Sequence, residues 1–369
     1  MSIDLDPKYE SAYLEKVAVL YYQKDYDNCI KFAETSQKLF PKGIHFPWYK
    51  ADCYSAKFQY ENAIKALEEA LKINPNNDSV IASIGWDYYY LQNYMKATEY
   101  AEKALKVNSK SNSAQNLKKA LEKTKLPEGQ RVVNFVRDYY LYYNKVQDFE
   151  GKSKEISAKQ EVTVDEIKNY ISSVRVKDDL YTFVVSGALY DELMKLEDTN
   201  RILSKELDAS TFYIRINSFT QSTGYEFKKV LDSISKPEEK NLVIDLRDNS
   251  GGLAVPSNDI LDFLLPECVT SNVIYRDGYS RPYYSDEGQT KFKKIIILVN
   301  ENSASSSELL TLGLKKYLNN VVILGRPTVG KGVGQFTYED KAKKYMIFLV
   351  NHYWNVIGVN LIHNTPKWQ

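Results

Sequence analysis

The chain has 369 residues, a length that predicts two or three domains, each large enough to bury its own hydrophobic core. Its 49 lysines and arginines balance 48 aspartates and glutamates, so the net charge of +1 lacks the basic excess that nucleic-acid binding requires. The longest aliphatic run, Ile295 to Val299, is far shorter than the roughly 20 residues of a membrane span. No apolar run typical of a secretory signal lies near the amino terminus. We therefore expect no nucleic-acid partner, no membrane span and no uncleaved signal.

The cysteines are three in number, Cys29, Cys53 and Cys268, and none is in a CxxC pair. An odd number without paired spacing argues against a disulfide framework and against a zinc site. The sequence therefore predicts buried free thiols.

An internal repeat with a period of 34 residues covers residues 10–109. The matching positions are Tyr26, Tyr60 and Tyr94; Pro41, Pro75 and Ser109; Ala63 and Ala97; Ala70 and Ala104; and Ala51 and Gly85. Within a period, apolar and small residues recur at intervals of three and four, which predicts a pair of helices in each repeat. Pro41 and Pro75 end the second helix of their repeats because proline lacks an amide donor. Residues 106–125 are expected to form a capping helix.

This segment resembles tetratricopeptide repeats, with Trp48, Tyr54 and Tyr88 near the positions where that family has bulky residues. The resemblance implies about three repeats that present a concave surface to a peptide or protein partner. A packing or dimerisation arm is the alternative reading of the same pattern.

A second domain is expected to begin at Leu126-Pro127-Glu128-Gly129, the first proline and glycine break after the helical stretch. The predicted domains are therefore 1–125 and 126–369. In the second, helices are expected over 132–143, 164–174, 225–234, 255–265 and 305–317, and strands over 211–216, 241–246, 294–299 and 320–324. Strands that alternate with helices predict an α/β sheet, whose ligand-binding loops follow the carboxyl ends of the strands.

The loop after Leu246 ends in Gly251 and Gly252, whose amides can approach a ligand with no side chain in the way. This loop is either half of an oxyanion hole or an ordinary turn from strand to helix. The loop after Val299 carries Ser303, Ala304, Ser305, Ser306, Ser307 and Glu308 directly before a predicted helix. Its hydroxyl residues are either helix caps or include a nucleophile with an oxyanion donor in the following amide.

The loop after Leu324 nearly matches the phosphate-binding pattern GxxxxGK[ST]. Gly332 stands where that pattern needs a hydroxyl, however, and residues 333–338 favour a strand where it needs a helix. Lys331, flanked by Gly330 and Gly332, has another use. Burial favours its neutral amine, which can take a proton from a serine hydroxyl.

Together the three loops resemble those of the C-terminal processing peptidases, also called tail-specific proteases. The family's DLRxNxGG motif appears at 245–252, its SASASE motif at 303–308 and its GKGxxQ motif at 330–335, and residues 178–182 are similar to its DPYT stretch. The resemblance implies Ser305 as nucleophile, Lys331 as general base and Gln335 as the residue that orients the lysine. The oxyanion donors would be the amides of Ser306 and of Gly251 or Gly252.

The same resemblance, which covers roughly residues 130–365, implies a crotonase/ClpP-like α/β serine protease that cleaves polypeptides through an acyl-enzyme. It implies no metal and no cofactor, and it favours work outside the cytoplasm, whereas the sequence as it stands shows no export signal. The chain departs from the family at Ser306, where alanine is usual, so that Ser303, Ser306 and Ser307 stay open as alternative nucleophiles. A second departure is an additional residue at Asn319-Asn320. Residues 190–209 are also too few for the usual PDZ module, and the repeats are a candidate replacement for substrate docking.

Two other functions are compatible with the sequence. A Ser-His hydrolase would use His352 or His363, since His45 lies in the repeats. A non-catalytic adaptor would use both domains to bind peptides.

Overall fold

The computed structural model describes residues 3, 6–195 and 202–356 of the chain. It divides into two compact units, Met1–Pro127 and Glu128–Gln369. None of the helices in the described ranges is long and apolar enough to cross a membrane.

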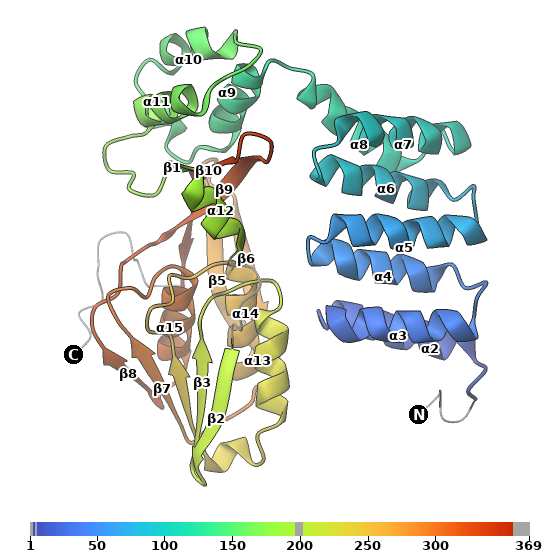
Figure 1. Ribbon diagram of the computed structural model, residues 1–369. Helices are drawn as coiled ribbons and strands as arrows, with labels where there is room; N and C mark the ends of the chain where they lie inside the picture. The colour runs from blue at the N-terminus through green and yellow to red at the C-terminus, as the bar shows by residue number, and fades with distance from the viewer. Residues whose placement is uncertain (1–2, 4–5, 196–201, 357–369) are drawn as a thin grey trace. The chain divides into compact units, whose positions relative to one another are not determined.

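The first unit is a stack of helices (Figure 1). Its elements are α2 (Glu10–Tyr22), α3 (Tyr26–Leu39), α4 (His45–Ala56), α5 (Tyr60–Ile73), α6 (Asp78–Tyr90), α7 (Tyr94–Val107) and α8 (Asn112–Thr124). Three helix pairs and one further helix confirm the predicted repeat array. The capping helix begins six residues later than expected, because residues 106 and 107 complete α7 and Ser111 precedes α8.

Small residues let the paired helices approach closely, as the repeat pattern predicts. Ala51, Ala63 and Ala97 are fully or almost fully buried. A side chain at Gly85 would meet Leu117 Cδ2 at 2.5 Å, so that α8 packs directly on the α6 backbone.

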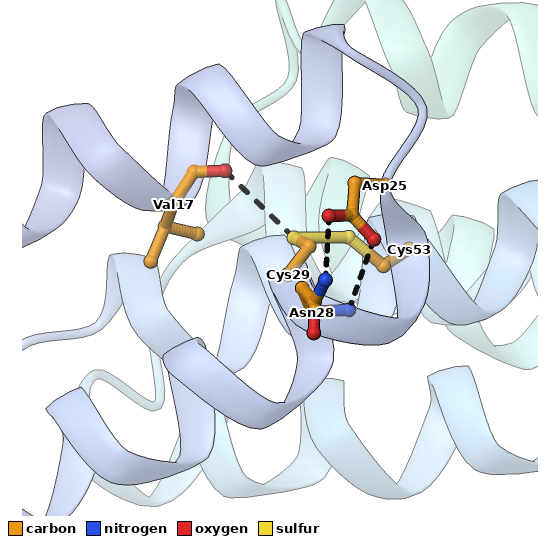
Figure 2. The surroundings of a disulfide bond; sticks show 5 residues. All are labelled: Val17, Asp25, Asn28, Cys29 and Cys53. Atoms are coloured by element: carbon orange, nitrogen blue, oxygen red, sulfur yellow. Dashed lines mark hydrogen bonds between the residues drawn. A yellow bond between two sulfur atoms is a disulfide. The ribbon is translucent and has the colours of Figure 1, made fainter. Parts of the chain in front are cut away.

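Cys29 and Cys53 form a disulfide, which corrects the expectation of free thiols (Figure 2). Both are fully buried and join α3 to α4, and the Val17 carbonyl oxygen of α2 lies 3.8 Å from Cys29 Sγ. The number and spacing of the cysteines did not reveal this pair, because helix packing brings together two residues 24 positions apart. Cys268 is a free thiol, but it is partly exposed.

A five-stranded sheet forms the centre of the second unit, in the order β2-β3-β4-β7-β8 (Figure 1). Its strands are β2 (Ile202–Asp208), β3 (Thr211–Ile216), β4 (Asn241–Asp245), β7 (Lys294–Val299) and β8 (Val321–Gly325). Strand β2 is antiparallel to β3, and the other neighbours are parallel. Helices α13 (Thr223–Asp232), α14 (Ala254–Leu264) and α15 (Ser306–Tyr317) pack on it around a buried aliphatic core.

A second, antiparallel sheet was not expected from the sequence. It consists of β1 (Phe183–Ser186), β10 (Tyr345–Asn355), β5 (Cys268–Tyr275) and β6 (Ser280–Ser285), and β9 (Val333–Asp340) also pairs with β10. Beside it lie α9 (Glu128–Tyr139), α10 (Phe149–Ser157) and α11 (Val164–Val174), whose apolar faces share a core with β9 and β10. Helix α9 ends at Tyr139, four residues before the predicted end. Helix α12 (Ala188–Lys195) and β2 occupy the described part of the segment that is too short for a PDZ module.

Candidate active site

The loops that leave β4 and β7 lie against each other at the carboxyl edge of the parallel sheet. The Ala304 backbone amide donates to the Asn249 carbonyl at 3.1 Å, and Asp248 Oδ1 accepts hydrogen bonds from the side-chain Nδ2 groups of Asn300 and Asn302. Asn249 is fully buried and donates to the Ile216 carbonyl of β3 at 2.8 Å. Two of the three predicted loops are therefore held together by hydrogen bonds that do not involve Ser305.

Ser305 is the residue that precedes α15, and its backbone has φ 54° and ψ −115°. An L-residue rarely adopts this conformation, which places the side chain on a sharp turn between loop and helix. The Ser305 amide donates to Glu308 Oε2 at 2.7 Å, and this bond helps to hold the turn. Unlike its neighbours, Ser305 is only partly buried.

The other serines of this loop donate their hydroxyls to backbone carbonyls. Ser303 Oγ bonds to Leu246 O at 2.8 Å, and Ser307 Oγ bonds to Asn249 O at 2.9 Å. Ser306 Oγ lies 3.0 Å from Gly252 O and 3.1 Å from Leu253 O. Each of the three is almost completely buried, so their hydroxyls act as ties between loops.

The two glycines of the β4 loop differ in what their amides do. The Gly251 amide donates to Asn249 Oδ1 at 2.8 Å. On either side of Gly252, Gly251 O and Leu253 N bond to the backbone of Phe219, whereas no hydrogen bond of the described residues uses the Gly252 amide. A Cβ at Gly251 would lie 3.0 Å from the Ser306 amide nitrogen, so the glycine loop and the Ser306 amide are in close contact.

Glu308 joins the serine loop to the lysine loop. Its carboxylate is 2% exposed and accepts four hydrogen bonds. The donors are Ser305 N at 2.7 Å, Thr328 Oγ1 at 2.6 Å, Gly330 N at 2.6 Å and Lys331 N at 2.9 Å. In the sequence, Glu308 is recognisable only as the final residue of the motif at 303–308. That its carboxylate connects two loops could not be predicted, because the second loop is distant along the chain.

Lys331 lies two residues before β9 and is half-buried. Its Nζ donates to Gln335 Oε1 at 2.6 Å and lies 5.2 Å from the centre of the Tyr181 ring. Burial lowers the pKa of Lys331 below its usual 10.5, and the Glu308 carboxylate partly opposes that shift. No direct hydrogen bond joins Ser305 Oγ to Lys331 Nζ among the described residues, and such contacts commonly tighten only with substrate present.

The stretch that contains Asp179 and Tyr181 packs against the lysine and its partner. The Tyr181 carbonyl accepts a hydrogen bond from Gln335 Nε2, so the amide of Gln335 is held at both ends. Asp179 is buried and accepts hydrogen bonds from the amides of Tyr181 and Thr182, both at 2.9 Å. Tyr181 thus belongs to the site, a role that the sequence indicated only through the motif around it.

Asp245, the last residue of β4, accepts hydrogen bonds from Arg247 of the loop that follows it. Although burial alone raises the pKa of Asp245, hydrogen bonds from Arg247 and Tyr213 outweigh it and lower the pKa to about 2. The carboxylate is therefore ionised at neutral pH and serves a structural purpose.

His352 of β10 lies over Gly334, where an added Cβ would meet its Nε2 at 2.0 Å. Its ring also contacts Tyr275 and Phe336, and burial lowers its pKa to about 4. The described contacts of His352 include none with the serines of the β7 loop. His363, the other candidate histidine, lies outside the described residues.

Comparisons with known proteins agree with this fold. Residues 210–366 match the model of "Peptidase family S41", and residues 48–77 match that of "Tetratricopeptide repeat". Residues 210–366 are thus similar to peptidase family S41 and residues 48–77 to a tetratricopeptide repeat, and the named relatives include carboxy-terminal processing proteases and CtpA-like serine proteases.

Two such relatives are a probable CtpA-like serine protease of Staphylococcus aureus (strain N315) and the carboxy-terminal processing protease CtpA of Bacillus subtilis (strain 168). The first is 34% identical over 168 residues, which is 42% of this chain and 34% of the relative. The second is 28% identical over 139 residues, 37% of this chain and 30% of the relative. The chain therefore spans about a third of the length of the curated relatives that it matches.

A solved lipoprotein from Streptococcus agalactiae covers 62% of this chain and 86% of its own, with 18% identity and a TM-score of 0.50. At this identity the likeness establishes the fold alone.

Proposed function

We propose that the chain is a serine endopeptidase in which Ser305 is the nucleophile, Lys331 the general base and Gln335 the residue that orients the lysine. The observation that carries the proposal is the buried Glu308 carboxylate, which accepts the amides of Ser305 and of Lys331 together. One side chain thereby sets the spacing between the backbone of the nucleophile and that of the base. The lowered pKa of Lys331 supports the same assignment, because a neutral amine is needed to accept a proton.

In the proposed reaction, Ser305 Oγ attacks the peptide carbonyl carbon while its proton passes to Lys331 Nζ. The amides of Ser306 and Gly252 donate to the oxyanion, and the positive end of the α15 dipole favours the same negative charge. Lys331 then protonates the departing amine, which leaves an ester on Ser305. A water molecule gives a proton to Lys331 as it attacks that ester, and the proton returns to Ser305 Oγ when the acid is released.

Ser305 is preferred to the other serines because the hydroxyls of Ser303, Ser306 and Ser307 already donate to backbone carbonyls. A nucleophile must exchange its proton with a base, and a buried hydroxyl tied to a carbonyl is poorly placed to do so. The Ser-His alternative is less well supported, since the contacts of His352 are with Gly334, Tyr275 and Phe336.

The test is cleavage of β-casein, an unfolded substrate, with the fragments identified by mass spectrometry. We expect Ser305→Ala and Lys331→Ala each to lower kcat/KM by about a thousandfold or more, as losses of nucleophile or base do in other serine hydrolases. Ser306→Ala and His352→Ala are the matched controls and should retain activity within about tenfold. Activity that survives Lys331→Ala but is lost in His352→Ala would establish the Ser-His alternative, and the absence of cleavage by the wild type would favour a peptide-binding adaptor.

A further inference from the structure

The first helices of the three repeats carry carboxylates and aromatic rings that the proposed peptidase does not use. Six residues, here called the carboxylate–tyrosine cluster, belong to this group: Tyr21 and Tyr22 of α2, Tyr49 and Asp52 of α4, and Asp87 and Tyr90 of α6. Tyr49, Asp52 and Ser55 are spaced three residues apart on α4 and therefore share one face of that helix. The Tyr49 ring lies 6.0 Å from that of Tyr21 on α2, and Ser55 Oγ donates to Asp87 Oδ1 on α6, so this face connects the three helices. Burial, together with the Asp52 carboxylate, raises the pKa of Tyr21 and of Asp87.

Asp87 is the most constrained member of the cluster. It is 4% exposed, and its Oδ1 accepts a hydrogen bond from Ser55 Oγ at 2.9 Å. Its Oδ2 is also buried and has no hydrogen-bond partner. Buried carboxylate oxygens are nearly always paired, so an orphaned one marks a place where a donor or a cation is missing.

Neither carboxylate has a lysine or arginine ion-pair partner within the described part of the chain; nearby lysines such as Lys50 and Lys57 pair with other acids. Burial raises the pKa of Asp52 to about 6. Burial and the negative charge of Asp52 raise the pKa of Asp87 to about 7, although the hydrogen bond from Ser55 lowers it in part. Burial thus disfavours the ionised form of both acids, and a cation would stabilise that form.

Aromatic faces complete the environment that a cation prefers. The rings of Tyr21 and Tyr49 lie 6.0 Å apart, and those of Tyr21 and Tyr22 lie 5.5 Å apart. Elsewhere in the same array, Lys16 Nζ lies 4.4 Å from the centre of the Phe32 ring, so the repeats already use this interaction internally.

Two of the six cluster residues occupy equivalent positions of the repeat. Tyr22 and Tyr90 are two periods of 34 residues apart, and the equivalent position in the middle repeat is the small Ala56. In a regular array, equivalent positions line up along one face. Tyr22 is 75% exposed and Tyr90 is 48% exposed, so this face is open to a ligand that extends over three repeats.

We propose that the carboxylate–tyrosine cluster binds a lysine or arginine side chain of a polypeptide. The partly exposed Asp52 forms the ion pair with the cationic group of that side chain, and the tyrosine rings contact its aliphatic part and its cationic group. The buried Asp87 adds a second negative charge. An organic cation fits better than a metal ion, because the described residues contain no group of three or more histidine, cysteine, aspartate or glutamate side chains that could hold a metal. The proposal concerns the repeat unit and does not depend on the peptidase chemistry.

The probe is a fluorescein-labelled glycine–serine peptide with three spaced lysines, added to the full chain carrying Ser305→Ala so that the peptide is not cleaved. Fluorescence anisotropy measures Kd at pH 8, where both aspartates are ionised. We expect Asp52→Asn to weaken binding at least tenfold and Asp52→Asn/Asp87→Asn to weaken it further, because asparagine keeps the shape and removes the charge. The control Glu34→Gln, which removes an exposed charge from α3, should leave Kd within twofold.

The same peptide with acetylated lysines should not bind, and an arginine version should bind. Equal binding of the acetylated peptide would overturn the proposal, as would an unchanged Kd in the double variant whose melting curve shows that it is folded. Displacement of the peptide by free butylamine at matched cation concentration would show a site for small amines instead of a polypeptide. Displacement by Ca²⁺ would show a metal site. Neither of these results bears on the cleavage test of Ser305 and Lys331.

Discussion

At Ser305 the chain adopts a conformation that costs a residue other than glycine about 1–3 kcal/mol, and three local features offset that cost. The Ser305 amide bonds to Glu308, the Ser305 carbonyl accepts the Leu309 amide of the first helical turn, and the Ala304 amide before it bonds to Asn249. The hydroxyls of Ser303, Ser306 and Ser307 donate to backbone carbonyls, and no such donation by Ser305 Oγ is among the hydrogen bonds of the described residues. Chemically identical side chains therefore have different surroundings because of their backbone.

Gly251→Ala tests how tightly the two loops must approach. The new Cβ would lie 2.8 Å from Ala304 O and 3.0 Å from Ser306 N, at a backbone φ of 102° that disfavours alanine. We expect the free energy of unfolding, measured by urea denaturation, to fall by about 1–3 kcal/mol. We also expect kcat for casein cleavage to fall, by a factor that corresponds to a larger free-energy change than the loss of stability. Gly278→Ala is the control, since it also has a positive φ but nothing within 4 Å of the added Cβ. Equal effects at both positions would show that backbone strain alone matters.

The pH dependence of cleavage tests Lys331 and Glu308 together. Activity requires the neutral amine, so the rate should rise with pH through the pKa of Lys331, and burial places that inflection below 10.5. Glu308 raises the pKa of Lys331, so Glu308→Gln should move the inflection to lower pH while kcat falls because the loops are less well held. A pH–rate profile of both proteins measures the shift. An inflection that stays in place or moves to higher pH would contradict the assignment of Lys331 as the base.

At the scale of elements, the disulfide between α3 and α4 is the main covalent constraint on the repeats. It closes a loop over a sequence separation of 24, for which the chain-entropy model gives a stabilisation of about 3 kcal/mol. Reduction or Cys29→Ser/Cys53→Ser should therefore lower protection from hydrogen exchange in α2, α3 and α4. Peptides from the core around β4 and β7 serve as the internal control. Unchanged protection in α3 and α4 would show that helix packing alone holds this region.

Strand and helix boundaries explain why the loops meet where they do. Strands β4, β7 and β8 are parallel, so their carboxyl ends and the loops that follow lie at one edge of the sheet. Lys331 precedes β9 and Gln335 lies within it, because residues 333–340 form a strand that pairs with β10 and not the helix of a phosphate-binding loop. The phosphate reading of Gly325 to Gly332 is therefore inconsistent with the fold.

At the scale of the whole molecule, the two units have separate cores, and every described contact of the candidate site lies in the second. We expect residues 128–369 to fold alone and to cleave casein with a kcat within about threefold of the full chain, because Tyr181, Ser305, Glu308, Lys331 and Gln335 are all present. Circular dichroism and the cleavage assay check the two parts of this expectation. A folded but inactive fragment would show that the repeats take part in catalysis or in substrate delivery.

The sequence by itself determined the repeat period, the helix ends set by Pro41 and Pro75, the strands of the parallel sheet and the three loops that follow them. These features depend on local rules, namely a period of 3.6 or 2 and the missing amide of proline, which act over a few neighbouring residues. The roles of Ser305, Lys331 and Gln335 were also suggested by short motifs, and they stay predictions until the variants are measured.

Only the tertiary structure decided which cysteines pair, that a second sheet exists, which serine hydroxyls are already bonded, and that Glu308 and Tyr181 contact Lys331 and its partner Gln335. Gln335 and Tyr181, which are hydrogen-bonded, are 154 residues apart in the sequence. Glu308 and Lys331, whose amide donates to the Glu308 carboxylate, are 23 residues apart. A buried polar group takes whichever partner the packing of distant segments brings within hydrogen-bond distance, and no local pattern records that choice.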